Sequence, residues 1–193
     1  MPEKIVKIIA GLGNPGKEYA LTRHNAGFCV LDLMALEFDT IIKKKNFDCK
    51  YLKTKHKDQK VFFVKPQSFM NKSGFALYRF ASFYKIPLED IIVIHDDIDL
   101  EFAEIQIVKS RGHGGHNGIR SIIDAFGRKD FIRVRIGVGS PEFKDDTADY
   151  VLSQFNTDEL KKFEKCINKA FDACLYILEN GVMAAMNRYN TKT

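Results

Sequence analysis

Short apolar runs alternate along the chain with longer segments of helical spacing. Two of the runs, residues 5–10 and 91–94, are almost continuously hydrophobic, which is typical of strands buried on both faces of a parallel sheet. In residues 131–138 the side chains alternate with the two-residue period of a strand. Between the strands, apolar residues recur every three or four positions, as on one face of a helix. The pattern predicts an α/β fold with a twisted mixed β-sheet flanked by helices.

The pattern also places the expected elements. Strands are expected at about 4–10, 47–53, 60–65, 91–94, 104–109 and 131–138. Helices are expected at 22–37, from Gly74 to Pro87, at 119–126, and from Thr157, the expected N-cap, to a stop at Gly181. No repeat, linker or low-complexity segment divides these elements, so we expect residues 1–193 to form a single three-layer domain.

Composition excludes several classes of protein. A chain of 193 residues with 45% hydrophobic content can bury a core without metal or disulfide staples. No window approaches the roughly 18 apolar residues that a membrane span needs. The N-terminal residues run directly into the first expected strand, so we expect no secretory signal. None of the four cysteines forms a C-x-x-C pair, and we expect reduced thiols in a cytoplasmic protein.

The positive charge of the chain is unevenly distributed. The formal net charge is +5, and the segment 43–60 holds eight lysines opposed only by Asp48 and Asp58. A lysine run is most often a solvated face. Combined with basic groups elsewhere, it becomes a candidate contact surface for a polyanion such as a nucleic acid.

The glycine-rich turn at 11–16 fits the dinucleotide-binding pattern G-x-G-x-x-G. That motif also needs a carboxylate about 20 residues further on, at the end of a second strand. The candidates here, Asp32 and Glu37, lie in the segment of helical spacing, and the strand at 61–64 ends in Lys65 and Pro66. We therefore expect no nucleotide cofactor.

Polar side chains follow four of the expected strands, and loops at the carboxyl ends of parallel strands are where α/β proteins bind ligands. A histidine paired with a carboxylate can activate water as a general base, and asparagine amides can stabilise an oxyanion. Zinc is an alternative, but the histidines lack H-E-x-x-H spacing, and no G-x-S-x-G motif indicates a serine nucleophile. The four clusters are Asn14 with His24, Met70 with Asn71, His95 with Asp96, and His116 with Asn117.

Several motifs together resemble the bacterial peptidyl-tRNA hydrolases, and the resemblance covers essentially the whole chain. They are Gly-Leu-Gly-Asn-Pro-Gly at 11–16 with Tyr19 and Thr-Arg-His-Asn at 22–25, Phe-Met-Asn at 69–71 with Ser73 and Gly74, His-Asp-Asp-Ile-Asp-Leu at 95–100, Gly-Gly-His-Asn-Gly at 114–118, and Arg-Val-Arg-Ile-Gly-Val-Gly at 133–139.

The resemblance implies a cytosolic, monomeric esterase that cleaves the ester between a peptide and the 3′-terminal ribose of tRNA, with no metal and no organic cofactor. His24 would be the general base for water and Asp96 its hydrogen-bond partner, with Asn14 and Asn71 completing the catalytic set and Asn71 polarising the carbonyl. The implied substrate-binding residues are Asn14, Tyr19, Met70, Asn71, Gly115, His116 and Asn117.

Basic residues near the Gly-Gly-His-Asn turn are candidate tRNA contacts, because A-form phosphates are recognised by charge. Some relatives carry lysines where this chain has Gln106 and Val108, which leaves the contacting groups to be identified. The competing hypothesis is a non-catalytic RNA-binding module on the same fold. The candidate tRNA-binding residues are Lys109, Arg111, Arg133 and Arg135.

Overall fold

A computed structural model describes residues 6–143 and 146–191 of the chain. Within these residues, seven strands form one sheet in the order β2-β3-β4-β1-β5-β7-β6. The strands β4, β1, β5 and β7 are parallel, whereas β2, β3 and β6 pair antiparallel with their neighbours. The strands are β1 (Val6–Gly11), β2 (Lys44–Asn46), β3 (Cys49–His56), β4 (Gln59–Pro66), β5 (Ile91–Asp97), β6 (Ile105–Lys109) and β7 (Ile132–Gly137).

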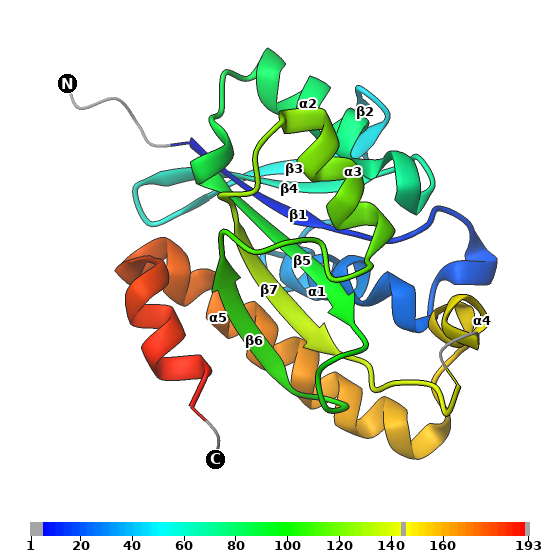
Figure 1. Cartoon of the computed structure of the whole chain (residues 1–193). Helices are drawn as coiled ribbons and strands as arrows, with labels where there is room; N and C mark the ends of the chain where they lie inside the picture. The colour runs from blue at the N-terminus through cyan, green and yellow to red at the C-terminus, as the bar shows by residue number, and fades with distance from the viewer. Residues whose placement is uncertain (1–5, 144–145, 192–193) are drawn as a thin grey trace.

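Helices cover both faces of this sheet, with α1 and α5 on one side and α2 and α3 on the other (Figure 1). The predicted α/β class with a mixed sheet between helical layers is thus confirmed. No helix in the described residues is long and apolar enough to cross a membrane. The helices are α1 (Ala26–Glu37), α2 (Ser73–Phe83), α3 (Asn117–Phe126), α4 (Thr147–Leu152) and α5 (Thr157–Tyr189), with short 3₁₀ turns η1 (Lys17–Tyr19), η2 (Arg23–Asn25), η3 (Met70–Lys72) and η4 (Leu88–Asp90).

The two central strands are buried on both faces, as their continuous apolar runs predict. Along β1 and β5 the side chains alternate between two hydrophobic clusters. Ile9, Ile92 and Ile94 pack in the cluster that includes α1 and α5. Ile8 and Val93 pack in the cluster with α2 and α3. Apart from Lys7, which is partly exposed, the residues of β1 from Ile8 to Gly11 are buried, and the polar residues at the end of β5 follow directly on this core.

One strand prediction is out of place. The run expected as a strand at 47–53 contains a two-residue turn, with Phe47 and Asp48 at φ of 50° and 55°. Such a turn joins antiparallel strands closely, and β2 and β3 pair across it. Phenylalanine is not a residue that indicates positive φ, so the sequence carried no clear turn signal. Residues 4 and 5 of the first expected strand lie outside the described residues.

The predicted start of the last helix needs a one-residue correction, whereas its predicted stop does not. Asn156, not Thr157, is the N-cap: its side-chain oxygen accepts from the amides of Asp158 and Glu159 at 3.0 and 2.9 Å. The carboxylate of Glu159 accepts from the amide of Asn156 at 2.8 Å, which completes a capping box. The expected stop at Gly181 is confirmed: its φ of 82° is non-helical and separates this helix from a further helical segment that runs to Tyr189, both counted within α5. The short helix α4 had no counterpart among the expected elements.

Candidate active site

The glycines of the first turn serve helix packing. A Cβ atom on Gly27 would lie 2.3 Å from the carbonyl oxygen of Ile94, and one on Gly11 would lie 2.2 Å from the oxygen of Gly27. Only glycine lets the first turn of α1 approach β1 and β5 so closely. The turn η2, which carries His24, directly precedes α1 and is therefore held beside the end of β5.

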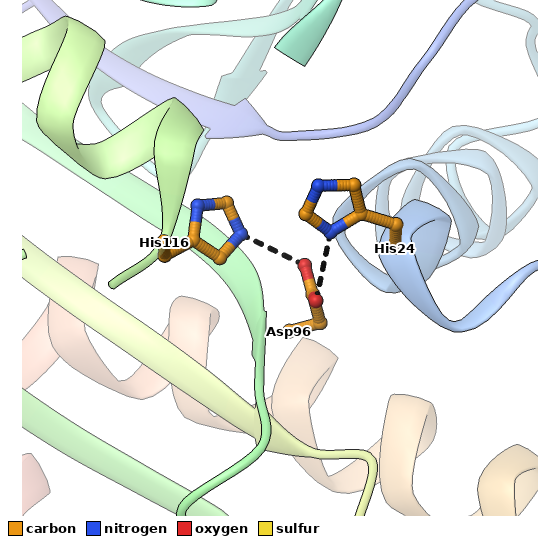
Figure 2. A group of neighbouring side chains, drawn as sticks. All are labelled: His24, Asp96 and His116. Carbon is orange, nitrogen blue, oxygen red and sulfur yellow. Dashed lines mark hydrogen bonds and ion pairs between the residues drawn. The ribbon is translucent and has the colours of Figure 1, made fainter. Parts of the chain in front are cut away.

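Asp96 binds two imidazoles at once (Figure 2). Its Oδ2 lies 2.8 Å from Nδ1 of His24, and its Oδ1 lies 2.9 Å from Nε2 of His116. The Asp96 side chain is only 2% exposed, and the two imidazole centroids are 5.0 Å apart. The three residues come from η2, β5 and the start of α3, so distant parts of the chain build the cluster.

Hydrogen bonding assigns the proton positions in this cluster. Nδ1 of His116 accepts from the amides of Gly118 and Ile119 at 3.0 and 3.3 Å, and so caps α3. Its Nε2 must therefore carry the hydrogen that is donated to Asp96. His24 likewise turns Nδ1 to the carboxylate, and in its neutral form Nδ1 is the donor. The lone pair of His24 then lies on Nε2, which is the geometry of a general base.

Burial and charge act in opposite directions on this pair. Burial lowers the pKa of His24, but the charge of Asp96 and the hydrogen bond to it outweigh burial, and the net pKa lies above its usual value. Burial raises the pKa of Asp96, while the nearby imidazoles and their hydrogen bonds hold it well below its usual range. Asp96 is thus ionised at neutral pH, and it stabilises a proton arriving on His24.

A cavity of about 450 Å³ opens in front of the imidazoles. His24 and His116 lie on one side of it together with Gly115 and Asn117. Helix α4 forms another wall through Ala148 and Val151. Of the predicted substrate-binding residues, Gly115, His116 and Asn117 therefore share one cavity with the predicted base.

Asn14 is a buried connector between the first turn and η3. Its side-chain oxygen accepts from the amide of Met70 at 2.8 Å. The side chain of Asn25 makes two hydrogen bonds to the Asn14 backbone: it accepts from the amide at 2.8 Å and donates to the carbonyl at 3.0 Å. Asn14 lines a cavity of about 350 Å³ together with Asn25 and Lys65, and it does not line the cavity of His24. Asn25 was missed by the sequence reasoning, although it follows His24 directly.

Asn71 and Tyr19, like Asn14 and Met70, do not line the histidine cavity. Asn71 is exposed and lines a separate cavity of about 370 Å³ with Phe75 and Arg79. Tyr19 is half-buried in η1, where its carbonyl accepts from the hydroxyl of Thr22 at 2.9 Å. The structure thus brings Asn14 and Met70 into contact with each other but does not join Asn71 to His24 in one cavity.

The predicted basic residues divide into two groups. Lys109 and Arg111 are exposed, whereas Arg133 and Arg135 are buried in β7. Arg133 donates to the carbonyls of Arg111 and Gly112, the latter at 2.7 Å. Burial, reinforced by the charges of Arg135 and Arg111, lowers the pKa of Arg133 to about 10. Its role in the fold is to hold the loop that leads to α3.

Arg135 is held by its own partners. Its Nε lies 2.6 Å from Oδ2 of Asp97, and its guanidinium also donates to the side chain of Gln106. Gln106 thus has a structural partner at the position where some relatives were expected to carry lysine. Both arginines still line a cavity of about 240 Å³ together with Arg111.

Comparisons with known proteins give one answer. The family model described as peptidyl-tRNA hydrolase matches residues 8–193. A peptidyl-tRNA hydrolase from Caldanaerobacter subterraneus is 46% identical over 183 residues, covering 95% of this chain and 98% of that protein. One from Rickettsia bellii is 47% identical over 174 residues, covering 90% and 94%.

The chain belongs to the peptidyl-tRNA hydrolase family.

The solved structures of this family agree. A crystal structure of peptidyl-tRNA hydrolase from Acinetobacter baumannii superposes with a TM-score of 0.91 at 33% identity, covering 97% of this chain and 96% of that one. A complex of peptidyl-tRNA hydrolase with N-propanol gives the same TM-score at 34% identity. The predicted activity, hydrolysis of peptidyl-tRNA, is thereby confirmed, and a purely RNA-binding module is not favoured.

The zinc alternative also has a structural counterpart. One possible ligand atom each from His24, Asp96 and His116 lies within 4.8 Å of the others, a cluster that sequence spacing did not reveal. These atoms are already hydrogen-bonded to each other, and the second nitrogen of His116 caps α3. A metal would have to replace the protons between them. The donor set therefore fits proton transfer better than metal binding, and a metal-free reaction stays a prediction.

His95 is a buried residue whose role the sequence did not indicate. Its Nδ1 lies 2.6 Å from the carbonyl oxygen of Asp96, and its ring meets that of His116 edge-on with centroids 4.8 Å apart. Burial, with the neighbouring His116, lowers the pKa of His95 well below its usual value. A neutral His95 thus donates to the backbone carbonyl of Asp96, beside the carboxylate that bonds the two imidazoles.

Proposed function

We propose that this protein hydrolyses the ester between the peptide and the 3′-terminal ribose of tRNA with His24 as the general base and Asp96 as its partner. One observation carries the assignment of the base. His24 is bonded to Asp96 through Nδ1 at 2.8 Å, while its ring lines a cavity of about 450 Å³. The substrate is inferred from the family. The hydrogen-bond pattern indicates that Nε2 of His24 is the atom that contacts the water.

The reaction follows from that geometry. Nε2 of His24 takes a proton from water as the water oxygen bonds to the ester carbonyl carbon, and the carbonyl oxygen becomes an oxyanion. When this intermediate collapses, the bond to the 3′ oxygen breaks and the ribose oxygen takes the proton back from His24. Asp96 stabilises the imidazolium between the two steps. A positioned base of this kind contributes about 10²–10⁴-fold to the rate.

Amide groups complete the proposed site. Asn14, whose side-chain oxygen is held by the amide of Met70, turns its nitrogen toward the substrate. Asn117 lines the cavity of His24 and orients the water, and Gly115 and His116 shape the same wall. Asn71 polarises the ester carbonyl. Tyr19 follows Asn14 in the first loop, and Met70 precedes Asn71 in η3. We assign both to substrate binding because of these positions.

The tRNA arm is proposed to lie on the edge that carries Lys109 and Arg111. Both residues are exposed, and they lie close to the turn that leads to α3. Arg133 and Arg135 contribute positive charge from beneath, in the small cavity that Arg111 also lines. Phosphate contacts of this kind position a nucleic acid without reading its sequence.

The remaining features of the proposal concern the whole protein. We infer a reaction that needs no metal and no organic cofactor, because the donor atoms around Asp96 hold protons. We infer also that residues 1–193 act as one domain, that the protein works as a cytoplasmic monomer, and that it returns tRNA to translation. Size-exclusion chromatography with light scattering tests the monomer, with a dimer mass as the contrary result.

The central experiment is a release assay with N-blocked aminoacyl-tRNA, run with and without a chelator. We expect release of the acyl group at equal rates in both conditions. Loss of the activity with the chelator, restored by added zinc, would assign the His24, Asp96 and His116 cluster to a metal. Tight binding without release would mean a non-catalytic RNA-binding module.

A further inference from the structure

Arg23, the residue before His24, is buried although arginine is usually exposed. Its side chain is 7% exposed, and its guanidinium leaves the turn η2 for a different part of the molecule. In Figure 1 the segment leading into α1 lies beside α4. The Arg23 side chain bonds to Ser153, which directly follows α4. A buried guanidinium requires partners, because desolvating an unpaired charge is strongly unfavourable.

The partners of Arg23 all come from the end of α4 and the start of α5. One terminal nitrogen donates to the hydroxyl of Ser153 at 2.8 Å and to the carbonyl of Gln154 at 2.7 Å. The other lies 2.6 Å from Oε1 of Glu159. The guanidinium also lies over two rings, 4.6 Å from the centroid of Tyr150 and 4.8 Å from that of Phe155.

The same corner of the molecule forms a wall of the catalytic cavity. Helix α4 ends at Leu152, directly before the Ser153 that binds Arg23, and it supplies Val151 to the cavity that His24 also lines. The backbone amide of Arg23 donates to the carbonyl of Ser153 at 3.1 Å, which adds a second link. One residue therefore joins the turn that carries His24 to the α4 wall of the same cavity.

We propose that Arg23 is a positioning residue for the hydrolysis, which holds His24 against Asp96 and fixes the α4 wall at the matching distance. The proposal rests on the proposed function of His24 as the base. Its physical reason is that a buried ion pair rarely stabilises a fold more than a well-packed apolar side chain would. A fork of donors and two stacked rings does, however, define one orientation. A misplacement of about 1 Å in a catalytic group can cost about 10²-fold in rate.

The test compares Arg23→Met with Arg23→Lys. Methionine keeps much of the side-chain volume between the two rings but loses every polar contact, whereas lysine keeps the charge without the fork. We expect kcat on N-blocked aminoacyl-tRNA to fall about 10–100-fold in Arg23→Met, with a smaller change in KM, and Arg23→Lys to recover part of the loss. Arg188→Met is the matched control, because Arg188 lies over Tyr176 and Tyr189 at the far end of α5.

A second readout separates positioning from stability. The titratable groups that face His24 are Asp96 from β5 and His116 from α3. If Arg23 holds His24 against Asp96, NMR titration of the His24 imidazole should give a lower pKa in Arg23→Met, because Asp96 then raises the His24 pKa less. A folded Arg23→Met protein with unchanged kcat and an unchanged His24 titration would overturn the proposal, even if its Tm were lower.

Glu159→Gln covers the case in which Arg23→Met fails to fold. Glutamine can still accept from the Asn156 amide and so keep the cap of α5, but it gives up the ion pair with Arg23. We expect a several-fold loss of kcat in this variant. Wild-type turnover in both Glu159→Gln and Arg23→Lys would overturn the proposal. The NMR titration needs no substrate, so it tests the positioning role of Arg23 by itself. The proposed function fails separately, if His24→Ala retains activity.

Discussion

Asp96 and Asp97 are neighbours at the end of β5, yet their partners differ in chemistry. Asp96 is bonded to two imidazoles, His24 and His116, at 2.8 and 2.9 Å. Asp97 is bonded to the guanidinium of Arg135 at 2.6 Å. Successive side chains of a strand point to opposite faces of a sheet, so the two carboxylates bind different partners, although both residues line the cavity of about 450 Å³.

The difference separates a group that moves protons from one that holds charge. An imidazole changes its charge between about pH 5 and 8, whereas a guanidinium stays charged at every accessible pH. Asp96 can therefore stabilise a proton that comes and goes. Asp97 on β5 and Arg135 on β7 form a permanent pair that joins these two strands, and Arg135 also donates to Gln106 on β6. Asp96 and Asp97 carry the same carboxylate group, and the bonding partner determines what each one can do.

The largest effect should come from removing His24, the proposed base bonded to Asp96. His24→Ala should lower kcat by about 10²–10⁴-fold and leave the fold intact, because Asp96 keeps its bond to His116. Circular dichroism and Tm report on the fold, and single-turnover release from N-blocked aminoacyl-tRNA reports on the chemistry. More than half of the wild-type rate in this variant would remove His24 from the mechanism.

Asn71→Ala tests how far the proton-transfer region extends. If the Asn71 amide stabilises the oxyanion, kcat should fall by about 10²–10³-fold, as for the loss of one such donor. Because Asn71 lines a cavity different from that of His24, a change confined to KM would show instead that it only binds substrate. Steady-state kinetics over a full substrate range separates these results.

Replacing the two carboxylates one at a time tests the comparison directly. Asp96→Asn should lower kcat/KM less than His24→Ala does, because it disturbs the orientation of the base without removing it. If His24 is the general base, as proposed, activity requires its neutral form, and kcat/KM should fall as the pH drops through the His24 pKa. Asp96 raises that pKa, and without its charge the acid limb of the profile should move to lower pH.

Asp97→Asn is the matched control for this profile. It changes the neighbouring carboxylate by the same single atom but leaves the bonds between Asp96 and the imidazoles in place. We expect an acid limb at the wild-type position. The same shift in both variants would mean that the two carboxylates act on His24 together, and the division drawn between them would be wrong.

The smallest effect on chemistry should come from the exposed cations of the other region. Reversing Lys109 and Arg111 together to Glu should raise KM for full-length peptidyl-tRNA at low salt, and it should flatten the salt dependence of binding by about one log–log unit per lost phosphate contact. A minimal substrate with only the acylated terminal nucleotides should be cleaved almost normally, since it does not reach this edge.

Lys165→Glu with Lys169→Glu makes the same charge change on exposed positions of α5 and serves as the control. A salt series of kcat/KM for both substrates gives the measurement. Equal losses on the full and the minimal substrate would mean that Lys109 and Arg111 support the cleft itself. The tRNA contact surface would then be sought first in the lysine-rich segment 43–60.

Much of the site was predictable because its residues stand in short motifs after strands. His24, Asp96 and His116 each lie in such a motif, and the carboxyl ends of parallel strands meet at one edge. Arg23 and Asn25 lie in the same motif as His24, but their roles depend on partners elsewhere. The contacts of Arg23 with Ser153 and Gln154 join residues 130 and 131 positions apart, and no local pattern reports them.

The basic residues show the opposite limit of sequence reasoning. The alternation in 131–138 correctly places Arg133 and Arg135 on one face of a strand, and a polar strand face is usually solvated. Here a loop covers that face, since Arg133 donates to the carbonyls of Arg111 and Gly112. Whether an arginine is exposed depends on what packs over the strand. The two-residue period of the sequence carries no information about that packing.

The amino-acid sequence by itself determined the class of fold, the order of the main strands and helices, and the family, because hydrophobic period and short motifs are local properties. Tertiary structure alone decided which carboxylate meets the imidazoles. His24 and Asp96 are 72 residues apart, and their bond exists because the glycines at the start of α1 let that helix close on β1 and β5. Tautomers and pKa shifts follow from that contact, since burial and charge act only over a few ångströms.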